Sequence, residues 1–247
     1  MPAPLSLLCL PCAGASATMY LRWRRLLPRW IEVVPLELPG RGSRLGEDFV
    51  EDFDALVSLL CSEHEAALRG NFALFGHSMG ALLAWGIAQR LRATGRPLPR
   101  ALLVSGSAAP SQRDPDRFVD MDDDEALIAD MRKQGGTPEA LFASPELLRM
   151  TLDTLAADYR VCEGFAHRGA APLPVPLHVF AGREDDIQRW RVEAWSAEAL
   201  DAGFSLDWFE GGHFFIRQHE AQVLAALVRR LPQSMGAGEA DVLPAIA

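Results

Sequence analysis

Short apolar runs alternate with longer amphipathic stretches along most of this chain. The apolar runs, which predict strands, cover residues 5–10, 31–36, 72–75, 101–105, 176–181 and 204–209. Helical periodicity is found between or after them, in residues 49–68, 79–92, 189–200 and 217–231. Such alternation is typical of a mostly parallel sheet with helices on both faces, so we predict an α/β fold.

One stretch interrupts the alternation. From about residue 111 to residue 167 the sequence carries helix signals and no strand signal. These signals are a capping-box pair at Asp122 and Glu125, a stop at Gly135-Gly136, and N-cap residues before first-turn prolines at Thr137-Pro138 and Ser144-Pro145. A helical insertion between two strands predicts a lid over the functional end of the sheet.

The helix expected after Pro145 is amphipathic. Its apolar face carries Leu148, Leu152, Leu155 and Tyr159, whereas Arg149 and Asp153 lie on the opposite face. Packing on the protein body accounts for part of any such stripe. From the position of the helix in the insertion, we expect the four apolar residues to line a substrate chamber and the helix to shift as one piece.

Composition and charge narrow the class of protein. The chain has 247 residues, of which 49% are hydrophobic and 23% charged, as in an ordinary globular protein of one domain. The net charge of −9 disfavours nucleic acid as a partner. No apolar run reaches the length of a membrane span, and the N-terminus lacks the charged region of a signal peptide. We therefore expect a soluble cytoplasmic protein, with a disordered tail at residues 233–247.

The four cysteines do not form a recognisable metal or redox motif. Cys9 and Cys12 are spaced as C-x-x-C, but no second pair of Cys or His completes a tetrahedral zinc site. Redox use of this spacing also needs a helix N-terminus beneath the first cysteine. We interpret Cys9 as a core thiol and Cys12 as a loop thiol, and we expect neither a metal nor a cofactor.

The strongest chemical signal is Gly76-His77-Ser78-Met79-Gly80. The pattern G-x-S-x-G occurs by chance in glycine-rich chains, but here an apolar run precedes it and a helical pattern follows it. A strand–turn–helix with this sequence presents a serine on a strained elbow, as in the α/β-hydrolases. We predict that Ser78 is a nucleophile.

Partners for the serine occur in the order that this fold uses. His213 lies in a glycine turn just after the last predicted strand, and a histidine with an ordinary pKa of about 6.5 suits proton transfer. Glu184, Asp185 and Asp186 follow the fifth strand, and spacing alone does not choose among them. The order serine, acid, histidine is that of α/β-hydrolases.

Two backbone N–H groups are needed to stabilise the oxyanion of acyl transfer. One is expected from Met79, directly after the serine. The other is expected from the loop after the first strand, residues 11–16, whose small side chains allow close approach to a substrate.

Several segments together resemble the type II thioesterases, the stand-alone editing enzymes of nonribosomal peptide and polyketide assembly lines. The similarity extends over nearly the whole chain up to about Leu231, and one departure is Ala15, where the family usually has a second glycine. The resembling segments are Pro11-Cys12-Ala13-Gly14-Ala15-Ser16-Ala17, Leu38-Pro39-Gly40-Arg41, Phe75-Gly76-His77-Ser78-Met79-Gly80, Gly135-Gly136-Thr137-Pro138 and Gly211-Gly212-His213-Phe214-Phe215.

The resemblance implies an α/β-hydrolase fold in which Ala13 is the second oxyanion donor. It also supports Asp185 as the acid, because the family's acid follows Gly-Gly-x-x-Asp and this chain reads Ala181-Gly182-Arg183-Glu184-Asp185. The implied activity is hydrolysis of acyl thioesters on the phosphopantetheine arms of carrier proteins. Separately, we expect the protein to be a monomer. A carboxylesterase or acyltransferase on the same fold, and a non-catalytic protein that binds carriers, are the alternatives.

Overall fold

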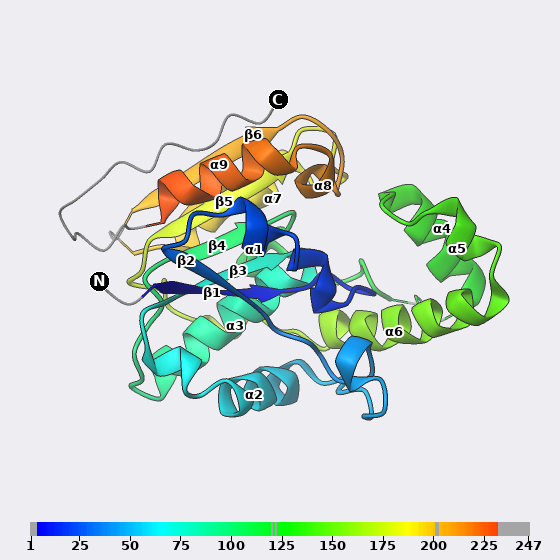
Figure 1. The fold of residues 1–247 in the computed structure, drawn as a ribbon, viewed down its shortest axis with the longest axis horizontal. Coiled ribbons are helices and arrows are strands. Elements are labelled where there is room, and N and C mark those ends of the chain that lie inside the picture. Colours follow the sequence, from blue (N-terminus) through cyan, green and yellow to red (C-terminus); the bar gives the residue numbers. More distant parts are fainter. Residues whose placement is uncertain (1–3, 120, 122, 201–202, 232–247) are drawn as a thin grey trace.

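The computed structural model describes residues 4–119, 121, 123–200 and 203–231. Its centre is a parallel sheet of six strands in the order β2-β1-β3-β4-β5-β6 (Figure 1). The strands are β1 (Leu5–Leu10), β2 (Ile31–Pro35), β3 (Phe72–His77), β4 (Leu102–Ser105), β5 (Leu177–Gly182) and β6 (Phe204–Phe209). The parallel sheet that we predicted is confirmed.

Helices cover both faces of the sheet. One apolar core packs α2 and α3 against the sheet, and a second core on the opposite face involves α1, α8 and α9. The central strands are buried on both sides, which explains why they read as continuous apolar runs. The helices are α1 (Trp23–Leu26), α2 (Phe53–Glu63), α3 (Met79–Ala93), α4 (Asp124–Gln134), α5 (Glu139–Phe142), α6 (Pro145–Glu163), α7 (Arg189–Glu193), α8 (Phe215–Gln218) and α9 (Glu220–Arg230).

Three predicted helices are shorter or divided in the structure. The helix predicted at residues 49–68 begins at Phe53, because the Asp52 side chain accepts the N–H of Ala55 and acts as the N-cap. The segment 189–200 is α7 followed by a 3-10 helix, Ala194–Glu198. The segment 217–231 divides into α8 and α9 at His219, whose φ of −119° is not helical.

The predicted insertion is helical and lies between β4 and β5. It contains α4, α5 and α6, which extend from the carboxyl end of the sheet on the right of Figure 1. Two capping predictions were wrong by one residue: the N-cap of α4 is Asp123, and the N-cap of α5 is Pro138 rather than Thr137. Asp122 and the predicted tail at residues 233–247 lie outside the described residues.

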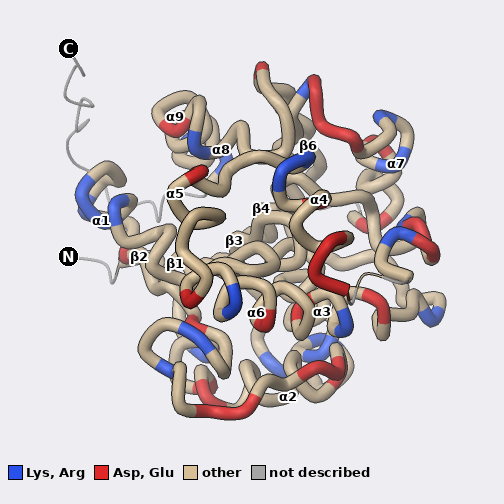
Figure 2. Tube along the Cα trace, turned by 90° about the vertical axis from the view of Figure 1, so that its right-hand side faces the viewer, with Lys and Arg blue, Asp and Glu red and all other residues tan. Residues whose placement is uncertain are grey.

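The strand order determines where a site can form. β1 has β2 on one side and β3 on the other, so the chain reverses its direction of progress between β1 and β3. Loops that follow neighbouring strands separate at such a point and leave a crevice at their carboxyl ends. The loop after β1 and the serine elbow after β3 flank this crevice. Figure 2 views this end of the molecule, with the insertion helices α4, α5 and α6 toward the viewer.

Candidate active site

The serine elbow has the strained geometry that the motif predicts. Ser78 has φ 55° and ψ −118°, and it is the only non-glycine with a positive φ among the described residues. Its neighbouring glycines are sterically required: a Cβ on Gly76 would lie 1.9 Å from the Gly80 carbonyl oxygen, and one on Gly80 would lie 2.2 Å from the Leu10 carbonyl oxygen. The elbow therefore packs directly on β1 and holds Ser78 at the crevice.

Asp185 and His213 are in direct contact. Asp185 Oδ2 lies 2.8 Å from His213 Nδ1, and the two side chains are 4% and 12% exposed. His213 therefore has its Nε2 left for a reacting group. His213 and Ser78 line one cavity of about 280 Å³, close to the lower end of the range for ligand pockets (about 300–1,000 Å³).

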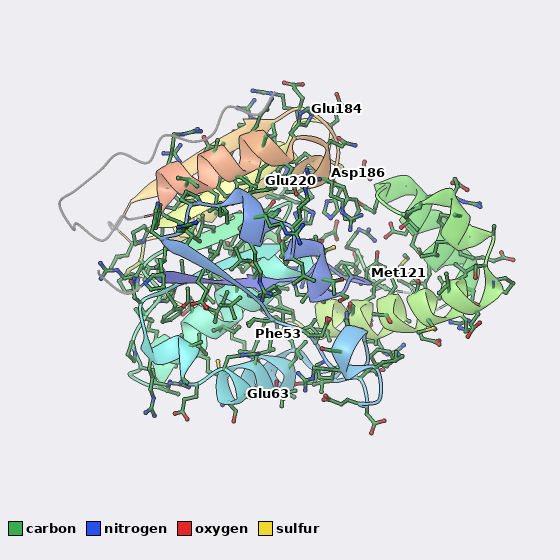
Figure 3. The ribbon with its side chains drawn as sticks, in the orientation of Figure 1. Phe53, Glu63, Met121, Glu184, Asp186 and Glu220 are labelled. Atoms are coloured by element: carbon green, nitrogen blue, oxygen red, sulfur yellow. The ribbon has the colours of Figure 1, made fainter. Side chains whose placement is uncertain are left out.

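The two acids on either side of Asp185 lie in environments that differ from that of Asp185. Asp186 is half exposed and pairs with Lys133 of α4 at 2.8 Å, and Glu184 is exposed. Figure 3 labels both residues on the loop after β5, with Asp186 on the side of the helical insertion. Of the three consecutive acids, Asp185 is the one in contact with His213.

The expected oxyanion loop borders the same cavity. Cys12, Ala13 and Gly14 line it, together with Met79 from the elbow. Gly14 has φ +72°, and the Ala15 N–H donates to the Cys12 carbonyl at 3.1 Å. The left-handed position is thus Gly14, so Ala15 in place of the usual second glycine leaves the turn unstrained.

The family model for the thioesterase domain matches residues 6–234. The chain belongs to the thioesterase family. It is 33% identical to the thioesterase PikA5 of Streptomyces venezuelae, with 98% of this chain and 87% of PikA5 covered.

Solved structures agree with this assignment. The type II thioesterase BorB from the borrelidin biosynthetic cluster is 37% identical, with 94% of each chain covered and a TM-score of 0.85. ClbQ from the colibactin NRPS/PKS pathway is 29% identical, with 92% of this chain and 97% of ClbQ covered and a TM-score of 0.84. The protein is accordingly a hydrolase with thioesterase chemistry.

The apolar stripe of α6 divides between two environments in this thioesterase. Leu155 and Tyr159 line the cavity with Ser78, whereas Leu148 and Leu152 do not. All four pack in the core between α6 and the helices α4 and α5, and Leu155 and Tyr159 border the cavity as well. The expectation that all four residues line the chamber was therefore wrong for Leu148 and Leu152. Thr151 also lines the cavity, so the direction of each side chain, and not its position along α6, decides which residues border it.

The thioesterase also contains a buried ion pair that we did not predict. Arg41, in the loop after β2, pairs with Asp158 of α6 through two hydrogen bonds of 2.5 and 2.7 Å. A sequence signal was available, because Asp158 lies three residues after Leu155 and four before Cys162, on the buried face of the helix. This pair ties the inner half of α6 to the body, which argues against the whole helix shifting as one piece.

Two further buried groups support the site. His77 is fully buried beneath His213, with ring centroids 5.0 Å apart, and its Nδ1 lies 3.0 Å from Ser105 Oγ. Burial lowers the pKa of His77 well below its usual value, so the ring is neutral.

In the insertion, the Asp130 carboxylate accepts hydrogen bonds from the Tyr159 hydroxyl and from the Arg117 guanidinium. This network anchors the Tyr159 side chain.

The cysteine interpretation is consistent with the structure. Cys9 and Cys12 are free and buried. Burial raises the pKa of the Cys12 thiol to about 11, which disfavours the reactive thiolate.

In the part of the chain that the structure describes, no group of three or more His, Cys, Asp or Glu side chains is arranged to hold a metal ion. Every helix described is too short or too polar to cross a lipid bilayer.

Proposed function

We propose that this thioesterase hydrolyses acyl groups from the phosphopantetheine arms of carrier proteins and so removes mischarged or stalled units from a nonribosomal peptide or polyketide synthase. The family assignment supports the hydrolytic chemistry. The names of its relatives support the setting, since BorB is a type II thioesterase of a biosynthetic cluster and ClbQ belongs to an NRPS/PKS pathway. We expect a cytoplasmic monomer that meets carrier domains transiently and needs no cofactor.

The first half of the mechanism is acylation of the serine. Ser78 Oγ attacks the thioester carbonyl carbon, and His213 Nε2 accepts the hydroxyl proton. Asp185 accepts the Nδ1–H bond, which selects the tautomer and stabilises the imidazolium. The N–H groups of Ala13 and Met79 stabilise the oxyanion. The C–S bond then breaks, and the pantetheine sulfur leaves with the proton from His213.

The second half is hydrolysis of the acyl-serine. A water molecule attacks the ester carbonyl while His213 accepts one of its protons, and the same N–H groups stabilise the second oxyanion. The C–O bond to Ser78 breaks, the serine recovers its proton from His213, and the acid is released. A thiol with a pKa of about 8.5 leaves readily, so protonation of the leaving group is less demanding than for an alcohol.

One observation carries this proposal. The Asp185–His213 contact of 2.8 Å lies beside a strained Ser78, and the serine and the histidine border one cavity. A protein that only binds carriers would need neither the strained serine nor the carboxylate behind the imidazole. In nucleophilic catalysis, the strained turn exposes the serine hydroxyl and the carboxylate orients the histidine that activates it.

The experiment compares one acyl group on two thiols. An acyl-carrier protein should be hydrolysed with a kcat/KM at least about tenfold above that of the same acyl group on N-acetylcysteamine, because carrier binding contributes energy remote from the reacting bond. Ser78→Ala should reduce both activities to background and abolish labelling by a fluorophosphonate.

Other outcomes separate the alternatives. Equal efficiency on the two thiols would leave a generic small-thioester hydrolase. Faster turnover of matched oxygen esters would favour a carboxylesterase, and transfer of the acyl group to an added alcohol or amine would favour an acyltransferase. Carrier binding without turnover or labelling at Ser78 would identify a non-catalytic binding protein.

A further inference from the structure

The Arg41–Asp158 ion pair is among the most enclosed charged contacts in the described residues. The two side chains are 7% and 2% exposed, and the two terminal nitrogens of the Arg41 guanidinium, Nη1 and Nη2, both contact the carboxylate. Bidentate pairing of this kind fixes the plane of both groups as well as their distance. Asp158 is thereby held in one orientation at the inner end of α6.

A third donor completes the arrangement. The backbone N–H of Gly14 donates to Asp158 Oδ2 at 2.7 Å, across 144 positions of sequence. Gly14 directly follows Ala13, whose N–H is proposed above to bind the oxyanion. Leu155, one turn before Asp158, lies against the same loop, because a Cβ on Gly14 would be 3.2 Å from Leu155 Cδ1. The inner half of α6 therefore supports the oxyanion loop.

These contacts determine the direction of the Ala13 N–H. That N–H shares a rigid peptide plane with the Cys12 carbonyl, which accepts from the Ala15 N–H at 3.1 Å. The next peptide plane carries the Gly14 N–H, which Asp158 holds. With both planes fixed, the backbone torsions at Ala13 have little freedom.

The far end of the loop is held separately. Glu37 accepts from Ser16 Oγ at 2.6 Å and from the Ala17 N–H at 2.9 Å. Loss of the Asp158 contact would therefore release residues 12–15 without detaching the whole loop. A local loosening of this kind changes the oxyanion donor more than it changes the fold.

We propose that Arg41 and Asp158 are positioning residues that orient the Ala13 N–H through Gly14, and that they make the oxyanion hole depend on the seating of α6. This inference rests on the proposed role of Ala13 in catalysis. While Asp158 accepts the Gly14 N–H, the Ala13 N–H points at the oxyanion; loss of that contact misorients the donor. The lid and the chemistry are thereby coupled through one carboxylate.

The test uses a small acyl-N-acetylcysteamine thioester, so it does not depend on carrier recognition. Asp158→Ala should lower kcat about 10- to 100-fold and change KM less than threefold, because removal of one oxyanion donor costs about 10²–10³-fold and here the donor is only misoriented. A trifluoromethyl ketone analogue, whose Ser78 adduct carries an oxyanion, should lose affinity by the same factor as kcat/KM. A thioether analogue without an oxyanion should bind unchanged.

A double variant separates positioning from stability. Arg41→Met with Asp158→Leu replaces the buried pair by apolar side chains of similar size, an exchange that often preserves folding. It also removes the acceptor for the Gly14 N–H, so kcat should stay low even when Tm is restored. Recovery of kcat in the double variant would overturn the proposal, as would equal losses of affinity for the ketone and the thioether.

A control pair lies away from the cavity. Asp207 of β6 contacts Arg230 of α9 at 3.1 Å and is partly buried. Asp207→Ala should lower Tm and leave kcat within about twofold of the unmodified enzyme. Failure of the unmodified enzyme to cleave any thioester would count against the proposed function, whereas normal cleavage with a fully active Asp158→Ala variant would count only against this inference.

Discussion

At the scale of single residues, three consecutive carboxylates have three different environments. Asp185 is nearly buried against His213, Asp186 is half exposed and paired with Lys133, and Glu184 is exposed. Chemistry that depends on the imidazole should therefore respond to one of them and hardly to the others.

Substitution of the acids by their amides tests this difference. Asp185→Asn should lower kcat about 10³- to 10⁴-fold, because the amide favours the wrong histidine tautomer while preserving the shape of the site. Glu184→Gln and Asp186→Asn should each change kcat less than about threefold. Steady-state kinetics on one thioester measure all three variants. A larger loss from either control would mean that Asp185 is not the group that orients His213.

At the scale of elements, α6 makes two kinds of contact. Its apolar residues from Leu148 to Tyr159 pack with α4 and α5, and two of them, Leu155 and Tyr159, also line the cavity. Asp158 of the same helix accepts the Gly14 N–H from the loop after β1. Leu152 and Leu155 are neighbours on this helix and are 2% and 5% exposed, but only Leu155 borders the cavity. They form a matched pair for testing what the helix contributes.

Truncation of these two leucines should give different results. Leu155→Ala should raise the ratio of kcat/KM for an octanoyl thioester to that for an acetyl thioester by about threefold or more, because the chamber gains volume. Leu152→Ala should leave that ratio unchanged while lowering the free energy of unfolding by about 2–5 kcal/mol, the usual range for buried Leu→Ala. The same change in ratio for both variants would show that lid packing, and not the chamber wall, sets acyl-chain preference.

At the scale of the whole molecule, buried histidines couple stability to pH. Burial, with a further contribution from Arg230, lowers the pKa of His178 to about 4, and burial also lowers the pKa of His77 well below its usual value. Both rings are neutral in the folded state near pH 6, while the unfolded chain takes up protons below about pH 6.5. Since the unfolded state then binds more protons, the free energy of unfolding should fall as the pH decreases from 6.5 toward 4.

His178→Gln tests this linkage outside the active site. The ring contacts Ser205 on the neighbouring strand, and glutamine keeps a polar group there without titrating. Urea unfolding at several pH values should give a smaller pH slope for the variant between pH 6.5 and 4.5. Above pH 7.5 the two slopes should agree, which serves as the internal control. Equal slopes below pH 6.5 would contradict a neutral His178 in the fold.

The sequence by itself determined the features that depend on neighbouring residues. Apolar runs indicated the six strands, and Gly76-His77-Ser78-Met79-Gly80 indicated the elbow, because a strained turn needs glycines at fixed offsets. The same local logic identified the helices of the insertion but not their boundaries to the residue. Capping depends on which of several adjacent polar side chains reaches the first turn, as between Asp122 and Asp123.

Only the tertiary structure decided which distant groups meet. Periodicity placed Leu148 to Tyr159 on one face of α6 but could not say which of these residues border the cavity. Spacing could not choose among Glu184, Asp185 and Asp186, because the path of the loop sets which carboxylate reaches His213. Arg41 and Asp158 are 117 positions apart and meet only because the sheet and the helical insertion bring their elements together. The helical pattern places Asp158 on the buried face of α6 but does not identify its partner, because that contact depends on how the whole chain packs.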